Sequence, residues 1–325
     1  MAVMTLVKAI NNALDIKLQD NKDVVIFGED VGYEGGVFRV TQGLQQKHGA
    51  ERVFDSPLAE SGIVGTAVGM AVAGMKPVIE MQFSGFAYPG FNQMISHVAR
   101  MRNRSRGKYT SSMVIRMPYG GGIKALEHHS ESMEALYAHI PGLKVVIPST
   151  PHDAKGLLIS AIESEDPIIY MEPKRIYRAV KQEVSEDKFN VQIGKANIVQ
   201  QGTDVTVVSY GAMMRDTQKA LALAKKAGIS VELIDLRTIY PIDKETIMKS
   251  IKKTGRLVTV AEAPTTFGIG AEMMAIANEE AFLHLEAPPK RVTGFDTIFP
   301  LPQGEHHYLP SPEKIYYEIE RTVKF

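Results

Sequence analysis

Short apolar runs alternate with helical patterns along the first half of the chain. Leu6–Leu18 places its apolar residues on one helical stripe and leads into the run Val24–Phe27, which predicts a helix followed by a buried strand. A further helix is predicted at Asn92–Arg104, and another after Thr150, whose spacing to Asp153 is typical of a helix cap. The remaining strands of this half are predicted at Val78–Phe83, Met113–Ile115, Val145–Ile147 and Ile168–Met171. This alternation is typical of a parallel sheet covered on both faces.

A second series of apolar runs follows a polar, charged stretch at residues 181–190. Strands are predicted at Val205–Val208, Val231–Ile234 and Leu257–Val260, and helices at Ala212–Ala227, Asp243–Lys253 and Gly270–Ala281. The last helix, Pro312–Phe325, has apolar residues at helical spacing and should dock on this second unit. We therefore predict an α/β protein of two doubly wound domains, residues 1–180 and 191–325, joined by a linker at 181–190.

Composition narrows the class of protein. A length of 325 residues suits two domains, and 37 basic residues balance 37 acidic ones, so no field for nucleic acid or a membrane surface is apparent. The absence of cysteine excludes disulfides, thiolate nucleophiles and cysteine-bound zinc. No export signal or long apolar segment is found, so we expect a cytoplasmic protein with neither a nucleic-acid nor a membrane partner.

Familiar catalytic motifs are missing. Gly268–Gly270 lacks the third glycine of a dinucleotide loop, and Gly120–Gly122 follows a strand without a clear helix start, so both are interpreted as turns. Neither a Gly-x-Ser-x-Gly elbow nor a His-Glu-x-x-His zinc motif is present. The pair His128–His129 is open to three interpretations: a solvated loop, a catalytic histidine or a metal site. The pair His306–His307 is interpreted as a surface loop.

Glu60 is the most unusual carboxylate. It precedes Ile63–Met75, a stretch made almost wholly of small or apolar residues and therefore suited to close helix packing. Glu60 either caps this helix or faces a dry cavity that would raise its pKa. An aromatic cluster, Ser84–Tyr88, follows the nearby predicted strand at the end where α/β sheets bind ligands. An acid beside an aromatic platform suits a flat heteroaromatic ligand.

Several separated blocks carry a family resemblance. They are Phe-Gly-Glu-Asp-Val-Gly (27–32), Gly-Gly-Val-Phe-Arg (35–39), Pro-Leu-Ala-Glu-Ser-Gly (57–62), Pro-Gly-Leu-Lys-Val-Val-Ile-Pro (141–148), Asp-Ala-Lys-Gly-Leu (153–157) and Ile-Asp-Leu-Arg-Thr (234–238). In these blocks the chain resembles the β subunit of the thiamine-diphosphate-dependent decarboxylase component of 2-oxo acid dehydrogenase complexes, most closely the pyruvate type. The resemblance covers nearly the whole chain.

The resemblance implies a transketolase-like fold, with a pyrimidine-binding domain followed by a transketolase C-terminal domain. It also implies that half of the cofactor site lies elsewhere, because the family's Gly-Asp-Gly motif for Mg²⁺ and diphosphate is absent from this chain. A separate α subunit would supply it, in an assembly of two α and two β chains. The expected reaction is decarboxylation of pyruvate and acetylation of the lipoyl domains of a dihydrolipoyl acyltransferase, whose subunit-binding domain would dock on the second domain.

The resemblance also implies roles for individual residues. Glu60 would hydrogen-bond a pyrimidine ring nitrogen of thiamine diphosphate, and Phe86 would pack on that ring. Leu58 and Gln82 would line the same pocket. His129 would donate protons to the substrate or during acyl transfer, with His128 the weaker candidate.

Two features of the sequence depart from the family pattern. A structural potassium ion is expected near Ala161 and Asp166, but Ser164 replaces a residue that is often aspartate. The segment Met171–Tyr177 is as similar to branched-chain relatives as to pyruvate ones, so branched-chain 2-oxo acid and acetoin dehydrogenases remain alternatives. A non-catalytic scaffold or binding module is the alternative outside enzymes, although intact Glu60, Phe86 and His129 disfavour it.

Overall fold

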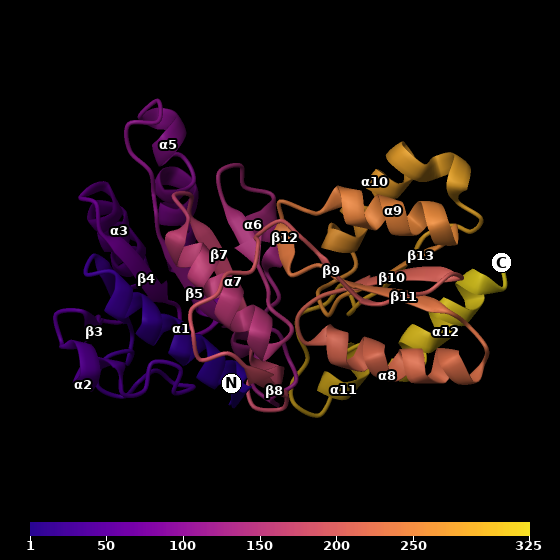
Figure 1. Cartoon of the computed structure of the whole chain (residues 1–325), viewed down its shortest axis with the longest axis horizontal. Helices are drawn as coiled ribbons and strands as arrows, with labels where there is room; N and C mark the ends of the chain where they lie inside the picture. The colour runs from indigo at the N-terminus through magenta and orange to yellow at the C-terminus, as the bar shows by residue number, and fades with distance from the viewer.

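Two α/β units lie side by side in the computed structural model, which describes residues 1–325 (Figure 1). The first contains a seven-stranded sheet in which every neighbouring pair is parallel except the edge pair β12–β6. Its strand order is β12 (Thr238–Tyr240), β6 (Lys144–Val146), β7 (Ile168–Pro173), β5 (Val114–Tyr119), β4 (Lys76–Glu80), β2 (Val24–Gly28) and β3 (Val53–Asp55). The carboxyl ends of the parallel strands therefore share one edge.

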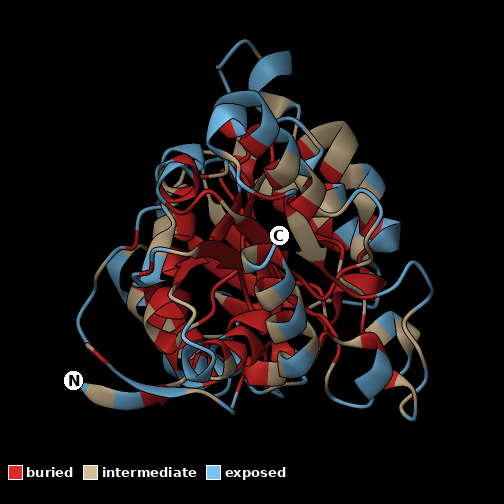
Figure 2. Ribbon diagram, turned by 90° about the vertical axis from the view of Figure 1, so that its right-hand side faces the viewer, coloured by how far each residue is buried: buried red, intermediate tan, exposed pale blue.

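Helices cover both faces of this sheet. Helices α1 (Leu6–Asp20) and α7 (Pro151–Glu163) pack together in one core, which takes Ile26 of β2. Helix α3 (Glu60–Val72) belongs to the opposite core, which takes the next residue of that strand, Phe27. Strand residues thus alternate between two apolar layers. The strands at the centre of the molecule consist of buried residues, whereas exposed residues lie on the outer helices and loops (Figure 2).

The predicted caps and most predicted elements are confirmed. The Thr150 side chain accepts a hydrogen bond from the Asp153 amide at the start of α7. The predicted helix Asn92–Arg104 is wrong, because this segment consists of the end of α4 (Tyr88–Gln93), a π-helix η2 (Met94–Val98) and α5 (Met101–Arg104). At this break the turn at Gly142 packs so closely on the Ala99 carbonyl that a side chain at position 142 would collide with it.

The second unit has a five-stranded sheet with helices on both sides (Figure 1). Its order is β14 (Lys290–Val292), β13 (Leu257–Val260), β10 (Val205–Ser209), β11 (Val231–Asp235) and β9 (Asn197–Gln200), with only β9 antiparallel to its neighbour. Helices α8 (Met213–Lys226) and α12 (Pro312–Val323) share one core, and α9 (Lys244–Thr254) and α10 (Ile269–Ala281) share the other. The predicted docking of the last helix is confirmed, while Phe325 is 79% exposed.

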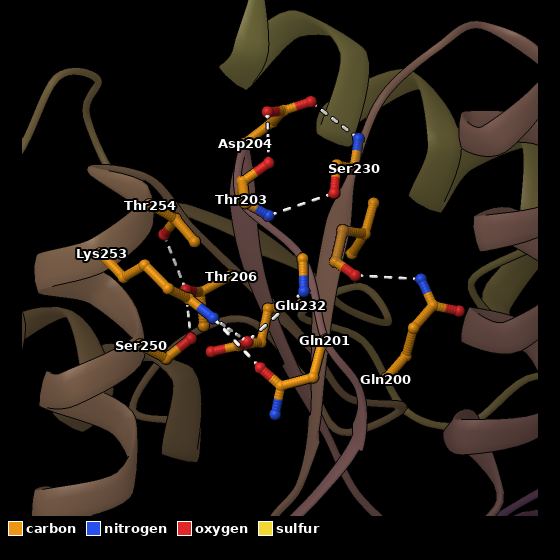
Figure 3. Close-up of polar contacts among 12 residues, drawn as sticks. Gln200, Gln201, Thr203, Asp204, Thr206, Ser230, Glu232, Ser250, Lys253 and Thr254 are labelled. Carbon is orange, nitrogen blue, oxygen red and sulfur yellow. Dashed lines mark hydrogen bonds and ion pairs between the residues drawn. The ribbon is translucent and has the colours of Figure 1, made fainter.

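A polar network fixes α9 to this second sheet (Figure 3). The Thr206 hydroxyl lies 2.7 Å from Ser250 Oγ and 2.8 Å from Thr254 Oγ1, and all three groups are buried. The buried Glu232 carboxylate pairs with Lys253 of the same helix. Although burial alone would raise the pKa of Glu232, hydrogen bonds from Lys253 and Ser250 lower it.

The two units are interlocked rather than joined by a simple tether. Lys181–Val184, within the predicted linker, forms strand β8 and pairs with β1 (Ala2–Thr5). Strand β12 leaves the second unit to pair with β6 of the first sheet, and one apolar core continues through both units. None of the helices combines the length and the apolar character needed to cross a bilayer.

Candidate functional site

The predicted site residues follow three strands of one parallel run in the first sheet. Glu60 follows β3, Gln82 and Phe86 follow β4, and His129 follows β5. The loop after β2, between β3 and β4 in the sheet, adds Glu29. Because the carboxyl ends of these strands meet at one edge, residues far apart in sequence converge there.

An acidic group forms one side of this edge. Glu60 is the first residue of α3 and is half-buried, which satisfies the predicted position at a helix N-terminus. Glu29 is 6% exposed; burial raises its pKa, and the negative charges of Glu60 and Asp30 raise it further. Gln82 donates a hydrogen bond of 2.9 Å to Asp30. This hydrogen bond joins Gln82 to the loop after β2 that also carries Glu29.

An aromatic group forms the other side. The His129 ring centroid lies 5.0 Å from that of Phe86 and 4.6 Å from that of Phe83, both in edge contacts. His129 Nδ1 is buried and has no hydrogen-bond partner. His128 is exposed and lies 6.1 Å from Tyr88, outside the ring cluster. The structure thus separates the two neighbouring histidines, and His129 is the one that faces Phe86.

Small residues permit this convergence. The loop after β4 contains the short helix η1 (Ser84–Phe86), and the loop after β5 contains η3 (Glu127–His129). A side chain at Gly85 would collide with the His128 carbonyl, so only glycine allows the two loops to touch. Ser84 Oγ also donates to the Glu131 carbonyl at 2.7 Å. On the far side, Gly90 packs against the Glu60 backbone.

Leu58 and the outer face of α3 lie apart from this cluster. Leu58 is 80% exposed, and its assignment to a pocket stays a prediction. Helix α3 buries Ile63, Val64 and Ala67 in the core but exposes Gly62 and Thr66. The predicted close packing therefore involves one face of the helix within this chain.

Beneath the site lies a buried ionic group that the sequence analysis missed. Arg116 of β5 donates to Glu172 at 2.7 and 3.1 Å and to Glu80 at 2.8 Å, and Tyr177 donates to Glu172 at 2.5 Å. Burial raises the pKa of Glu80, and the nearby Arg116 partly offsets that rise. The only sequence signal was a charged residue at or beside each of three apolar runs: Glu80, Arg116 and Glu172. Glu29 was also missed, although it directly follows the end of β2.

The residues present fit one half of a heteroaromatic cofactor site. Glu29 Oε2 and His129 Nδ1 are buried polar atoms without partners, and both lie at the edge that also holds the phenyl ring of Phe86. Buried polar atoms normally have partners, so these two are available to a ligand. No group of three or more His, Asp or Glu side chains is arranged to hold a metal ion. The unpartnered polar atoms beside an aromatic side chain suit a polar aromatic ring.

The predicted potassium ligands have other partners. The Asp166 carboxylate pairs with Arg102 at 2.8 Å and with Lys144 at 2.9 Å, and its pKa is lowered by these cations despite partial burial. The Ala161 carbonyl accepts the Ser164 amide. Two cations at the carboxylate disfavour a third, so the potassium ion stays a prediction that these contacts do not support.

Comparison with known proteins identifies the class and then the family. Residues 2–180 match the transketolase pyrimidine-binding domain, and residues 194–315 match the transketolase C-terminal domain. A solved structure described as a split-gene transketolase, an inactive beta4 tetramer, has the same fold, with a TM-score of 0.80 at 22% identity over 99% of both chains. The chain is thus a two-domain protein of the transketolase class, which confirms the predicted fold.

Full-length relatives refine this assignment. The chain is 57% identical to the pyruvate dehydrogenase E1 component subunit beta of Acholeplasma laidlawii, over 100% of this chain and 99% of the relative. It is 50% identical to the subunits of the same name in Mycoplasma genitalium, over 98% of each chain, and Staphylococcus aureus, over 100% of each. The chain belongs to the family of pyruvate dehydrogenase E1 component β subunits. The family prediction is confirmed.

Proposed function

We propose that this chain forms the pyrimidine half of a thiamine diphosphate site in a pyruvate dehydrogenase, and that it acts only together with an α subunit. The observation that carries the proposal is the ring contact of Phe86 with His129 at the sheet edge where Glu60 also lies, beside unpartnered polar atoms. The α subunit would hold Mg²⁺ and the diphosphate, because this chain has no motif for them. Full-length identity to named β subunits supports the same division.

Each site residue then has a defined task. When bound, thiamine diphosphate supplies the electron sink that decarboxylation of a 2-oxo acid requires. Glu60 would hold a proton at a ring nitrogen of the pyrimidine. Phe86 would orient the ring by stacking. His129 would deliver a proton to the substrate oxygen or to the lipoyl sulfur.

The proposal includes two partners. Two α and two β chains would form the active unit, and the second domain would contribute a two-fold contact between β chains. The same domain would offer a surface to the subunit-binding segment of a dihydrolipoyl acyltransferase, whose lipoyl domains accept the acetyl group.

Pyruvate is the favoured substrate, and a substrate panel tests it. The chain would be assembled with its α subunit and thiamine diphosphate, and the turnover of three substrates would be compared: decarboxylation for pyruvate and 3-methyl-2-oxobutanoate, and cleavage to an acetyl unit and acetaldehyde for acetoin. We expect kcat/KM for pyruvate to exceed that for 3-methyl-2-oxobutanoate by at least about tenfold, the discrimination that one or two methylenes provide, and to exceed that for acetoin as well. A preference for the branched acid or for acetoin would move the chain to the corresponding enzyme. No activity with any of them, despite assembly, would contradict the proposal.

A further inference from the structure

The turn of three glycines after β5 opens the loop that carries His129. We define residues 120–131 as the histidine loop. The Gly120 amide donates to the Glu131 carbonyl at 2.9 Å and so closes the base of this loop. Gly120 and Gly122 have φ angles of 80° and 92°, a left-handed conformation that favours glycine. Gly121 does not need glycine for its backbone angles, so another constraint acts there.

That constraint comes from the second domain. A side chain at Gly121 would collide with the ring of Phe299, and one at Gly120 would collide with the carboxylate of Glu262, which follows β13. Further along the loop, the Lys124 amide donates to the Glu305 carboxylate at 3.0 Å. The second domain therefore touches the histidine loop at three points, and each contact is made to the loop backbone.

Buried charge ties this contact to domain docking. Glu262 and Glu305 are 3% and 7% exposed, and Lys174 of the first domain is 4% exposed with no hydrogen-bond partner at Nζ. Burial lowers the pKa of Lys174 to about 8, and the negative charges of Glu262 and Glu305 oppose that fall. Burial raises the pKa of Glu262, while Arg175, Lys174 and the Gly121 amide oppose the rise. The carboxylates thus lose their compensating charge if the domains separate.

We propose that Glu262, Glu305 and Phe299 of the second domain are positioning residues, which hold the histidine loop so that His129 faces Phe86. This inference rests on the proposed function, because it assumes that His129 acts in acetyl transfer. It gives the second domain a role in placing that histidine. The contacts reach His129 through the loop backbone: Gly120 is bonded to Glu131, which also accepts from Ser84 beside Phe86. None of the three residues touches His129 itself.

Hydrogen exchange and kinetics on one set of variants test the charged contacts. Glu262→Gln and Glu305→Gln would be compared with Glu232→Gln, a buried carboxylate of the same domain that pairs with Lys253 away from the loop (Figure 3). In the assembled enzyme we expect faster exchange of amides 120–131 in the first two variants only. We also expect acetyl transfer to fall about ten- to a hundredfold, the effect of a small misplacement, with thiamine diphosphate affinity within about twofold.

A size swap tests the steric contact even if the charge variants fail to fold. Gly121→Ala should speed loop exchange and slow acetyl transfer. Because the two residues are in contact, the double variant Gly121→Ala/Phe299→Ala should show the same exchange and transfer rates as Phe299→Ala alone. Unchanged exchange in every variant, additive effects of the swap, or faster exchange with full acetyl transfer would each overturn the inference. If the parent enzyme does not decarboxylate pyruvate, the proposed function fails, whereas the exchange result still decides whether the second domain holds the loop.

Discussion

Arg116 offers the sharpest test of what supports the sheet edge. It lies in β5 between Glu80 of β4 and Glu172 of β7, and its side chain is 1% exposed. Replacement by methionine keeps an unbranched apolar stem but leaves two buried carboxylates without their cation. We expect Arg116→Met to fold but to lose a substantial part of its stability.

The contacts set the size of the loss. Three hydrogen bonds to carboxylates disappear, and each is worth about 1.5 to 3 kcal/mol. Protonation of one carboxylate relieves part of the cost, which brings the expected decrease in the free energy of unfolding to about 3 to 5 kcal/mol near neutral pH. Arg102→Met is the matched control: Arg102 is 46% exposed and pairs with Asp166, so its loss should cost less than about 1 kcal/mol.

The pH dependence provides a second check. Burial already raises the pKa of Glu80, and loss of Arg116 should raise it further. A carboxyl group whose pKa is higher in the folded state contributes stability that is present below its unfolded pKa, about 4.3, and is lost as pH rises. The difference in the free energy of unfolding between variant and parent should therefore become smaller from neutral pH toward about pH 5. Urea unfolding measures the free energy of unfolding of both proteins and its dependence on pH. A loss of less than about 1 kcal/mol at neutral pH, or a difference between variant and parent that grows on acidification, would refute this reasoning.

Three other predictions concern the site and the domain interface. Glu60→Gln should lower turnover of the assembled enzyme by about 100- to 10,000-fold, with a smaller change in cofactor affinity. A turnover number within about threefold of the parent, measured by steady-state kinetics, would exclude the acid role. His129→Ala should slow acetyl transfer to a lipoyl domain more than His128→Ala does. The reverse order would show that His128, and not His129, is the proton donor. Burial raises the pKa of both Glu134 and Asp235 to about 7, so the free energy of unfolding should fall as pH rises from about 5 to 7. Glu134→Gln should flatten that slope, and a slope of opposite sign would contradict the assignment.

Local patterns predicted most elements because local physics decides them. The stripe from Leu6 to Leu18 forms α1, and Thr150 caps α7, since amphipathic spacing and a capping side chain act within one turn of helix. The predicted helix Asn92–Arg104 is interrupted at Ala99, where the distant Gly142 turn packs on it, and such a contact leaves no mark on local spacing. His306 and His307 are exposed as predicted, although they lie in the short helix α11 (Glu305–Tyr308) rather than in a loop.

The site could be predicted only in part from the chain alone. The carboxylate before a small apolar helix and the aromatic turn identified Glu60 and Phe86, but His129 gained its role from the family resemblance. The approach of His129 to Phe86 depends on contact between the loops after β4 and β5, which Gly85 permits. The packing of the second domain against Gly120–Gly122 could not be predicted, because three consecutive glycines indicate a turn but do not indicate which residues pack against it.

Binding of thiamine diphosphate to this chain, alone and with its α subunit, is the most direct test that the site is half of a shared one. Calorimetry with Mg²⁺ would compare the isolated chain, the isolated α subunit and their mixture. The proposal predicts no binding tighter than about 100 μM by this chain alone, a weak interaction of about −5.5 kcal/mol, and tight binding by the mixture. Binding by the isolated chain at micromolar or lower concentration would show a diphosphate site within these 325 residues and would contradict the division of the site between two chains.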